Sequence, residues 1–124
     1  MIYSLVFGLV TLAFGVIPKM VRPKKINSWY GYRTDISMKN QDTWNEANRY
    51  STNQYVLAGI ILLILGEIGH YFLHGKGYLV PLIGFIPVLM CTVFTTEKHM
   101  KKIFDENGKR IHRTNNLKRN NADD

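Results

Sequence analysis

Three long apolar stretches constrain this 124-residue chain more than any other feature of its sequence. They cover residues 1–17, 52–73 and 78–96, and only Glu67 interrupts them with a charge. A helix that crosses the hydrocarbon core of a bilayer needs about 20 mainly apolar residues, with about 17 as the lower limit. Lipid cannot satisfy exposed backbone groups, and three short strands cannot close a barrel. We therefore predict an all-α membrane protein with three transmembrane helices.

The first stretch is expected to stay in the mature protein as an anchor. A cleavable signal peptide carries positive charge before its apolar region. In this chain the basic residues, beginning with Lys19 and Arg22, follow the apolar stretch instead. Pro18 is expected to bend or end this helix near the membrane interface.

The distribution of basic residues predicts how the chain is oriented. Residues 18–51 hold seven lysines and arginines against three acidic residues, the link 74–77 holds one, and residues 97–124 hold eight. Cytoplasmic loops of membrane proteins carry the excess of lysine and arginine. We predict an N-terminus outside and a C-terminus in the cytoplasm, with a single membrane domain over residues 1–96 and a basic flexible tail over 97–124.

The net charge of +7 indicates a polyanionic partner. Because no folded nucleic-acid recognition module precedes the tail, we expect the anionic headgroups of the bilayer and no nucleic acid.

The second helix is predicted to begin before the membrane. Asn40 suits the N-cap position, and Asp42 suits the first turn of a helix. Five residues then share one helix face, and no proline or glycine occurs between residues 41 and 58; the five are Trp44, Ala47, Asn48, Ser51 and Tyr55. A long second helix is therefore expected to extend out of the membrane into the cytoplasmic segment 18–51.

Small residues and turn residues predict how the helices pack. Ser4, Gly8, Thr11 and Gly15 share one face of the first helix, which favours close packing within one protomer, with a homodimer seam as the alternative. Gly75 and Gly77 predict a tight turn between the second and third helices. In the third helix, Pro81 suits the first turn and Pro87 predicts a kink.

Glu67 and His70 form a candidate intramembrane polar site on one face of the second helix, which His74 extends. We favour side chains that reach the outer interface or a Glu–His pair over a ligand or proton site, and either over a metal site. A di-iron bundle would need further glutamates that the other helices lack. We therefore expect no metal and no cofactor. Cys91 is the single cysteine and is expected to pack as a small hydrophobic residue.

The stretch KKINSWYGYRT, residues 24–34, combines rings, a glycine and fixed positive charge. Rings and cations alone would anchor the chain among lipid headgroups. The alternative is a polar, ring-lined pocket, formed where this stretch folds onto the cytoplasmic part of the second helix. In that arrangement Arg33 and Glu46 would form a partly buried ion pair.

Residues 23–66 resemble the SdpI family of bacterial membrane proteins. The resemblance rests on Asn27–Thr34 (NSWYGYRT), Ser37–Lys39 (SMK) and Thr43–Arg49 (TWNEANR), followed directly by an apolar span. It implies a multi-pass protein of the bacterial cell membrane without enzymatic activity. It favours the pocket and implies these binding residues on the cytoplasmic face: Asn27, Trp29, Tyr30, Gly31, Tyr32, Arg33, Thr34, Ser37, Trp44, Glu46, Asn48 and Arg49.

The best-known member of that family confers immunity to a secreted killing peptide, the sporulation-delay toxin, and holds a repressor at the membrane. It has extra spans before the shared region, so this chain resembles a short form. The chain contains no catalytic triad, no metal quartet and no phosphate loop. We therefore expect immunity against a membrane-active peptide toxin. The alternatives are a signalling or scaffold protein that captures a cytoplasmic regulator and, third in order, a transporter or channel subunit, which would have to be a homo-oligomer.

Overall fold

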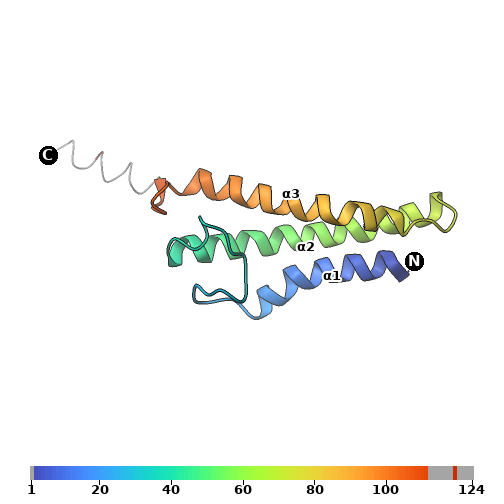
Figure 1. Ribbon diagram of the computed structural model, residues 1–124, viewed down its shortest axis with the longest axis horizontal. Coiled ribbons are helices and arrows are strands. Elements are labelled where there is room, and N and C mark those ends of the chain that lie inside the picture. Colours follow the sequence, from blue (N-terminus) through green and yellow to red (C-terminus); the bar gives the residue numbers. More distant parts are fainter. Residues whose placement is uncertain (1, 112–118, 120–124) are drawn as a thin grey trace.

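The computed structural model describes residues 2–111 and residue 119 of the chain. It contains three α-helices: α1 (Ile2–Met20), α2 (Gln41–Phe72) and α3 (Leu79–Ile103). Helix α2 lies between the other two along most of its length (Figure 1). The N-terminus and the α2–α3 turn lie at one end of the bundle, and the segment between α1 and α2 lies at the other, together with the end of α3 (Figure 1). We call this second end the motif end.

The predicted all-α architecture is confirmed. Helices α2 and α3 are long and apolar enough to cross a membrane, whereas the apolar part identified in α1, Gly8–Met20, is shorter. Large apolar side chains such as Ile64 and Ile83 are exposed, while Thr92 and Thr96 are buried. A water-soluble helical bundle would bury the isoleucines instead, so this distribution suits an apolar solvent.

Helices α1 and α2 approach closely at glycines. A Cβ atom at Gly8 would lie 2.3 Å from a side-chain atom of Leu63, and one at Gly15 would lie 2.6 Å from the backbone nitrogen of Val56. The small face predicted for α1 therefore packs within the chain, at Gly8, Thr11 and Gly15. Gly8 and Gly15 contact α2 and Thr11 is buried, which favours packing within one protomer over a homodimer seam. The side chain of Ser4 lies outside the described part.

Helix α2 begins where its sequence predicted. The side chain of Asn40 accepts a hydrogen bond from the Thr43 backbone at 2.9 Å, and the Thr43 hydroxyl accepts one from the Asn40 backbone at 3.0 Å. At 32 residues, α2 is about 48 Å long at 1.5 Å per residue. This length exceeds the hydrocarbon core of about 30 Å, so part of α2 must extend beyond it if the helix crosses a bilayer.

The α2–α3 turn depends on glycine, as predicted. Gly75 adopts a positive φ of 92°, a conformation that favours glycine. A Cβ atom at Gly77 would lie 2.1 Å from the Cα atom of His70, so no side chain fits there. Pro81 is buried in the first turn of α3, and Pro18 lies in the last turn of α1, which ends at Met20.

The prediction of a flexible tail from residue 97 is wrong for residues 97–111. Helix α3 continues to Ile103, and residues 104–110 turn back onto the start of α2. Phe104 is only 2% exposed, and both guanidinium contacts of Arg110 with the Asp42 carboxylate measure 2.8 Å. The prediction for residues 112–118 and 120–124 lies outside the described residues.

Candidate functional site

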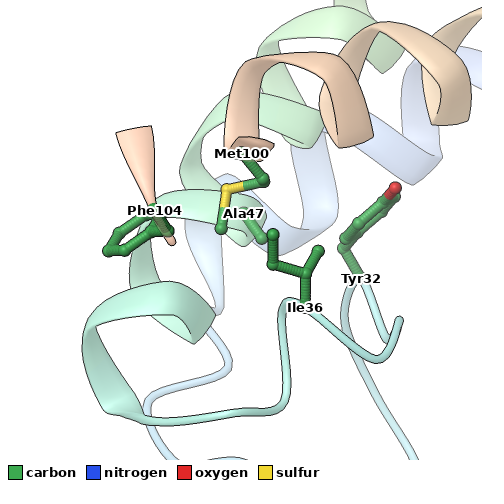
Figure 2. Close-up of a cluster of buried hydrophobic side chains, with 5 residues drawn as sticks. All are labelled: Tyr32, Ile36, Ala47, Met100 and Phe104. Atoms are coloured by element: carbon green, nitrogen blue, oxygen red, sulfur yellow. The ribbon is translucent and has the colours of Figure 1, made fainter. Parts of the chain in front are cut away.

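The motif segment, residues 23–38, is held between α2 and α3 by a small apolar core. Tyr32 and Ile36 from the segment pack with Ala47 from α2, and with Met100 and Phe104 from the end of α3 (Figure 2). This core thus joins the motif segment, α2 and the end of α3.

Asn48 fixes the backbone of the segment. Its side-chain oxygen accepts a hydrogen bond from the Tyr32 backbone nitrogen at 2.6 Å, and its amide donates to the Trp44 carbonyl at 2.9 Å. Gly31, with a φ of 108°, brings the chain so close that a Cβ atom there would lie 2.6 Å from the Asn48 oxygen. This contact explains why the motif combines a glycine with a distant asparagine.

Trp44 and Asn27 hold the first half of the segment. The Trp44 indole is fully buried and donates to the Pro23 carbonyl at 2.6 Å. The side-chain oxygen of Asn27 accepts hydrogen bonds from the backbones of Trp29 and Tyr30, at 3.0 and 2.8 Å. The Tyr30 hydroxyl donates to the carbonyl of Val21 at 2.9 Å. Trp44 is therefore part of the framework and lies in the protein interior.

Glu97, on α3, accepts hydrogen bonds from two hydroxyl groups of the motif segment. The Tyr32 hydroxyl and the Thr34 hydroxyl donate to the same carboxylate oxygen, at 2.8 and 2.7 Å. Burial, followed by the contact with Glu97, raises the pKa of the Tyr32 phenol well above its usual value. Ser37 closes the network, because its hydroxyl accepts from the Thr34 backbone at 2.7 Å and donates to the Tyr32 carbonyl.

The ion pair predicted between Arg33 and Glu46 is wrong. Glu46 pairs with Arg49, one turn along α2, at 2.6 Å, and with His99 of α3 at 2.9 Å. Arg33 is exposed and donates to the carbonyl of Ser28 instead. Arg49 has the shorter path to Glu46 because both side chains already lie on one helix face.

Two partners, Arg49 and His99, favour the ionised form of Glu46. Burial alone would raise the pKa of this carboxyl, but the hydrogen bonds and charges of Arg49 and His99 outweigh burial and lower the pKa below its ordinary value. The His99 ring also stacks on the ring of Tyr50, with centroids 3.8 Å apart and planes inclined by 7°. The contact between α2 and α3 at the motif end therefore combines the Glu46–His99 hydrogen bond with ring stacking.

These contacts leave a cavity of about 460 Å³, which we call the motif pocket. The motif contributes Tyr30, Gly31, Tyr32, Arg33 and Asn48 to its wall. The remaining wall comes mostly from apolar parts of all three helices: Phe14, Pro18, Ser51, Thr52, Tyr55, Leu89, Met90 and Val93. The pocket thus opens where the motif meets the apolar faces of the helices. This lining suits an amphipathic ligand, with rings and apolar side chains on one side and polar groups on the other.

Trp29 does not pack onto α2 as predicted. Its ring is 90% exposed and stands at the rim of the motif pocket. The other rings of the motif, Tyr30 and Tyr32, are partly or fully buried. Trp29 is therefore the motif ring with the greatest access to a partner or to lipid headgroups.

Glu67 and His70 lie far from this site, near the opposite end of α2 (Figure 1). Glu67 is exposed and His70 is half-buried beside the α2–α3 turn. Across the part of the chain that the structure describes, no group of three or more His, Cys, Asp or Glu side chains could hold a metal ion. The role predicted for these two residues stays a prediction.

The sequence interpretation missed Glu97, His99 and Tyr50. Glu97 and His99 directly follow the third apolar stretch, and the prediction placed them in a solvated tail. Their position offered one clue, since both fall within a single helical turn of the membrane boundary. Tyr50 lies within the predicted second helix but received no role.

The chain is similar to proteins of one known family. The model of the SdpI/YfhL protein family matches residues 24–95. The chain is also similar to "Uncharacterized protein YfhL" from Bacillus subtilis (strain 168), with 39% identity over 98 residues that cover 79% of this chain and 86% of that protein. No solved structure matches the chain significantly. The family match contains all but the first residue of the motif segment, the whole of α2 and most of the apolar part of α3.

Proposed function

The chain belongs to the SdpI/YfhL family, and from that premise we propose that it is a non-enzymatic membrane protein that binds a membrane-active peptide and protects the cell from it. One observation carries this proposal. The motif pocket joins the family motif to apolar helix faces, so a ligand can enter it while remaining in contact with the bilayer.

The proposed topology is three spans in the bacterial cell membrane, with the N-terminus outside and the motif end in the cytoplasm. Two features support it. Helices α2 and α3 have the length and composition of spans, and the basic residues of 18–51 lie at the motif end together with those of 97–111. The excess of lysine and arginine marks the cytoplasmic side. Helix α1 completes the bundle as the first span, and all three helices form one membrane domain.

The chemistry of the motif pocket favours a peptide with a ring or a branched apolar residue near one end. Phe14, Leu89 and Met90 offer an apolar wall. Arg33 is exposed at the same pocket and carries a positive charge. A peptide that lies along the membrane interface presents both kinds of surface at once.

Filling the motif pocket tests this proposal. Leu89→Trp places a large ring in the pocket wall, and Leu82→Trp, two turns earlier on α3 and exposed, is the matched control. Each variant is expressed in a strain that the sporulation-delay toxin kills, and survival is scored at equal protein level in the membrane. We expect the wild type and Leu82→Trp to protect and Leu89→Trp to fail. If the wild type gives no protection, the toxin is not its ligand.

Capture of a cytoplasmic regulator is a second candidate, and the exposure of Trp29 favours it. A ring that makes so little contact within its own chain is suited to anchor a partner. Trp29→Ala should then abolish co-purification of that regulator, while Trp29→Phe retains part of it. Both variants should unfold at the same denaturant concentration as the wild type. Equal recovery of proteins with Trp29→Ala and with the wild type would exclude this candidate.

A further inference from the structure

A second cavity adjoins the motif pocket, with which it shares Pro18, Asn48 and Thr52, and none of its lining residues is acidic. It measures about 460 Å³. We call it the basic groove and define it by Lys19, Arg22 and Lys24 at the end of α1 and by Asn45, Arg49 and Asn53 on α2. Two of its lining residues, Asn45 and Arg49, belong to the family motif. Its chemistry differs from that of the motif pocket, whose lining is mostly apolar.

Three of the four cations in the basic groove have no counter-ion within the described residues. Arg49 is paired with Glu46. Lys19, Arg22 and Lys24 make no side-chain hydrogen bond or ion pair in that part of the chain. An anion bound in the groove would be attracted by these three positive charges.

The wall that carries these cations is fixed in position. The indole of Trp44 binds the Pro23 carbonyl at 2.6 Å, and the Gln41 amide donates to the Lys24 carbonyl at 2.6 Å. The Val21 carbonyl accepts from the Tyr30 hydroxyl at 2.9 Å. The backbone between α1 and the motif segment is therefore held against α2, and the residues that carry these cations line the groove from that backbone.

The position of the basic groove along the bundle identifies the kind of anion. The apolar stretch of α1 ends at Ile17, and the last charged residue of α2 before its apolar stretch is Arg49. The basic groove lies at this boundary: residues of Pro18–Lys24 line it on one side, and residues of Asn45–Asn53 line it on the other. In a bilayer this is the level of the lipid phosphates.

From this arrangement we propose that the basic groove binds the phosphate of one anionic phospholipid. Arg22 and the two lysines would contact the phosphate oxygens, and the amides of Asn45 and Asn53 would contact the remainder of the headgroup. The proposal rests on the membrane embedding put forward above, and it is independent of peptide binding.

Native mass spectrometry of the full chain in detergent tests the proposal directly. Phosphatidylglycerol is the anionic probe and phosphatidylcholine the zwitterionic one. We expect the wild type to retain one phosphatidylglycerol with a preference of about tenfold or more, since each basic residue near an anionic headgroup adds to the attraction. No preference between the two lipids would overturn the proposal.

A matched pair of triple variants separates the basic groove from general surface charge. Lys19→Gln, Arg22→Gln and Lys24→Gln together remove three charges from the groove. The control triple, Lys98→Gln, Lys101→Gln and Lys102→Gln, removes three charges from exposed positions outside the groove, near the motif end of α3. The first triple should lose the preference, and the second should keep it within about threefold, because distant exposed charges are screened. Equal losses would overturn the proposal.

If the triple variant of the basic groove does not fold, a single substitution in the groove tests the proposal instead. Asn53→Glu adds a carboxylate to the basic groove at an exposed position, and Asn107→Glu adds one at an exposed turn outside it. Only Asn53→Glu should weaken phosphatidylglycerol binding, by about tenfold. Displacement of the lipid by millimolar inorganic phosphate would assign the groove to a soluble anion and contradict the lipid assignment. Loss of toxin protection with lipid retention intact would affect only the function proposed for the motif pocket.

Discussion

Asn48 should be the most sensitive single position of the site, and Asn48→Ala measures its contribution. The residue is 6% exposed, and its side chain bonds the Tyr32 backbone nitrogen at 2.6 Å and the Trp44 carbonyl at 2.9 Å. Alanine leaves the buried Tyr32 N–H without its acceptor, at a cost of about 1–3 kcal/mol, and loses one further hydrogen bond of about 0.5–1.5 kcal/mol. We expect the free energy of unfolding to fall by about 2–4 kcal/mol.

The assay is unfolding of the purified chain in mixed micelles with increasing sodium dodecyl sulfate, followed by circular dichroism. The control is Asn53→Ala, on the same helix, where the side chain is exposed and makes no hydrogen bond within the described residues. The control should change the unfolding free energy by no more than about 0.5 kcal/mol. If the two variants unfold alike, Asn48 does not hold the motif segment, and the reasoning about the motif pocket fails with it.

Three further predictions concern the contacts between helices. Glu46 has a lowered pKa in the folded chain, so its stabilising effect is complete above its ordinary pKa of 4.5 and is lost as the pH falls through the folded value. The free energy of unfolding of the wild type should therefore decline between about pH 5 and 3, and Glu46→Gln should make that decline smaller. Gly15→Ala should cost about 1–3 kcal/mol because the added carbon meets the α2 backbone, whereas Gly84→Ala, whose nearest neighbour would lie 3.7 Å away, should be tolerated in the same unfolding assay. Phe104→Ala should cost about 3–5 kcal/mol and the exposed Phe94→Ala much less, and equal effects would show that the turn after α3 does not dock.

The helices could be predicted from the sequence because their causes are local. The apolar stretches gave three helices, and Asn40 with Thr43 formed the cap at the start of α2. The buried face of α2 at Trp44 and Asn48 followed from its spacing. Turn glycines are equally local, since Gly75 needs only its own backbone conformation.

The end of α3 could not be predicted because its burial depends on distant residues. The lysines at 98, 101 and 102 give this region the composition of a solvated tail. Met100 and Phe104, four residues apart on the face between those lysines, instead pack on the motif segment. The contact forms only once residues 32 and 36 are in place, and no local pattern reveals that.

The details of the site depend on competition between partners. Glu46 could pair with several cations, and Arg49 and His99 have the better geometry, so Arg33 is excluded. Trp29 is exposed because Asn27 turns the backbone beneath it. Composition alone shows that rings and charges are present, and it does not show which of them become buried.

Cysteine labelling in intact cells tests the membrane arrangement most directly. In a Cys91→Ser background, single cysteines replace Trp29 at the motif end and Lys76 in the α2–α3 turn, and a membrane-impermeant maleimide is added before or after permeabilisation. The three-span topology predicts that Lys76→Cys reacts in intact cells and that Trp29→Cys reacts only after permeabilisation. Labelling of Trp29→Cys in intact cells, or equal labelling of both positions, would contradict it.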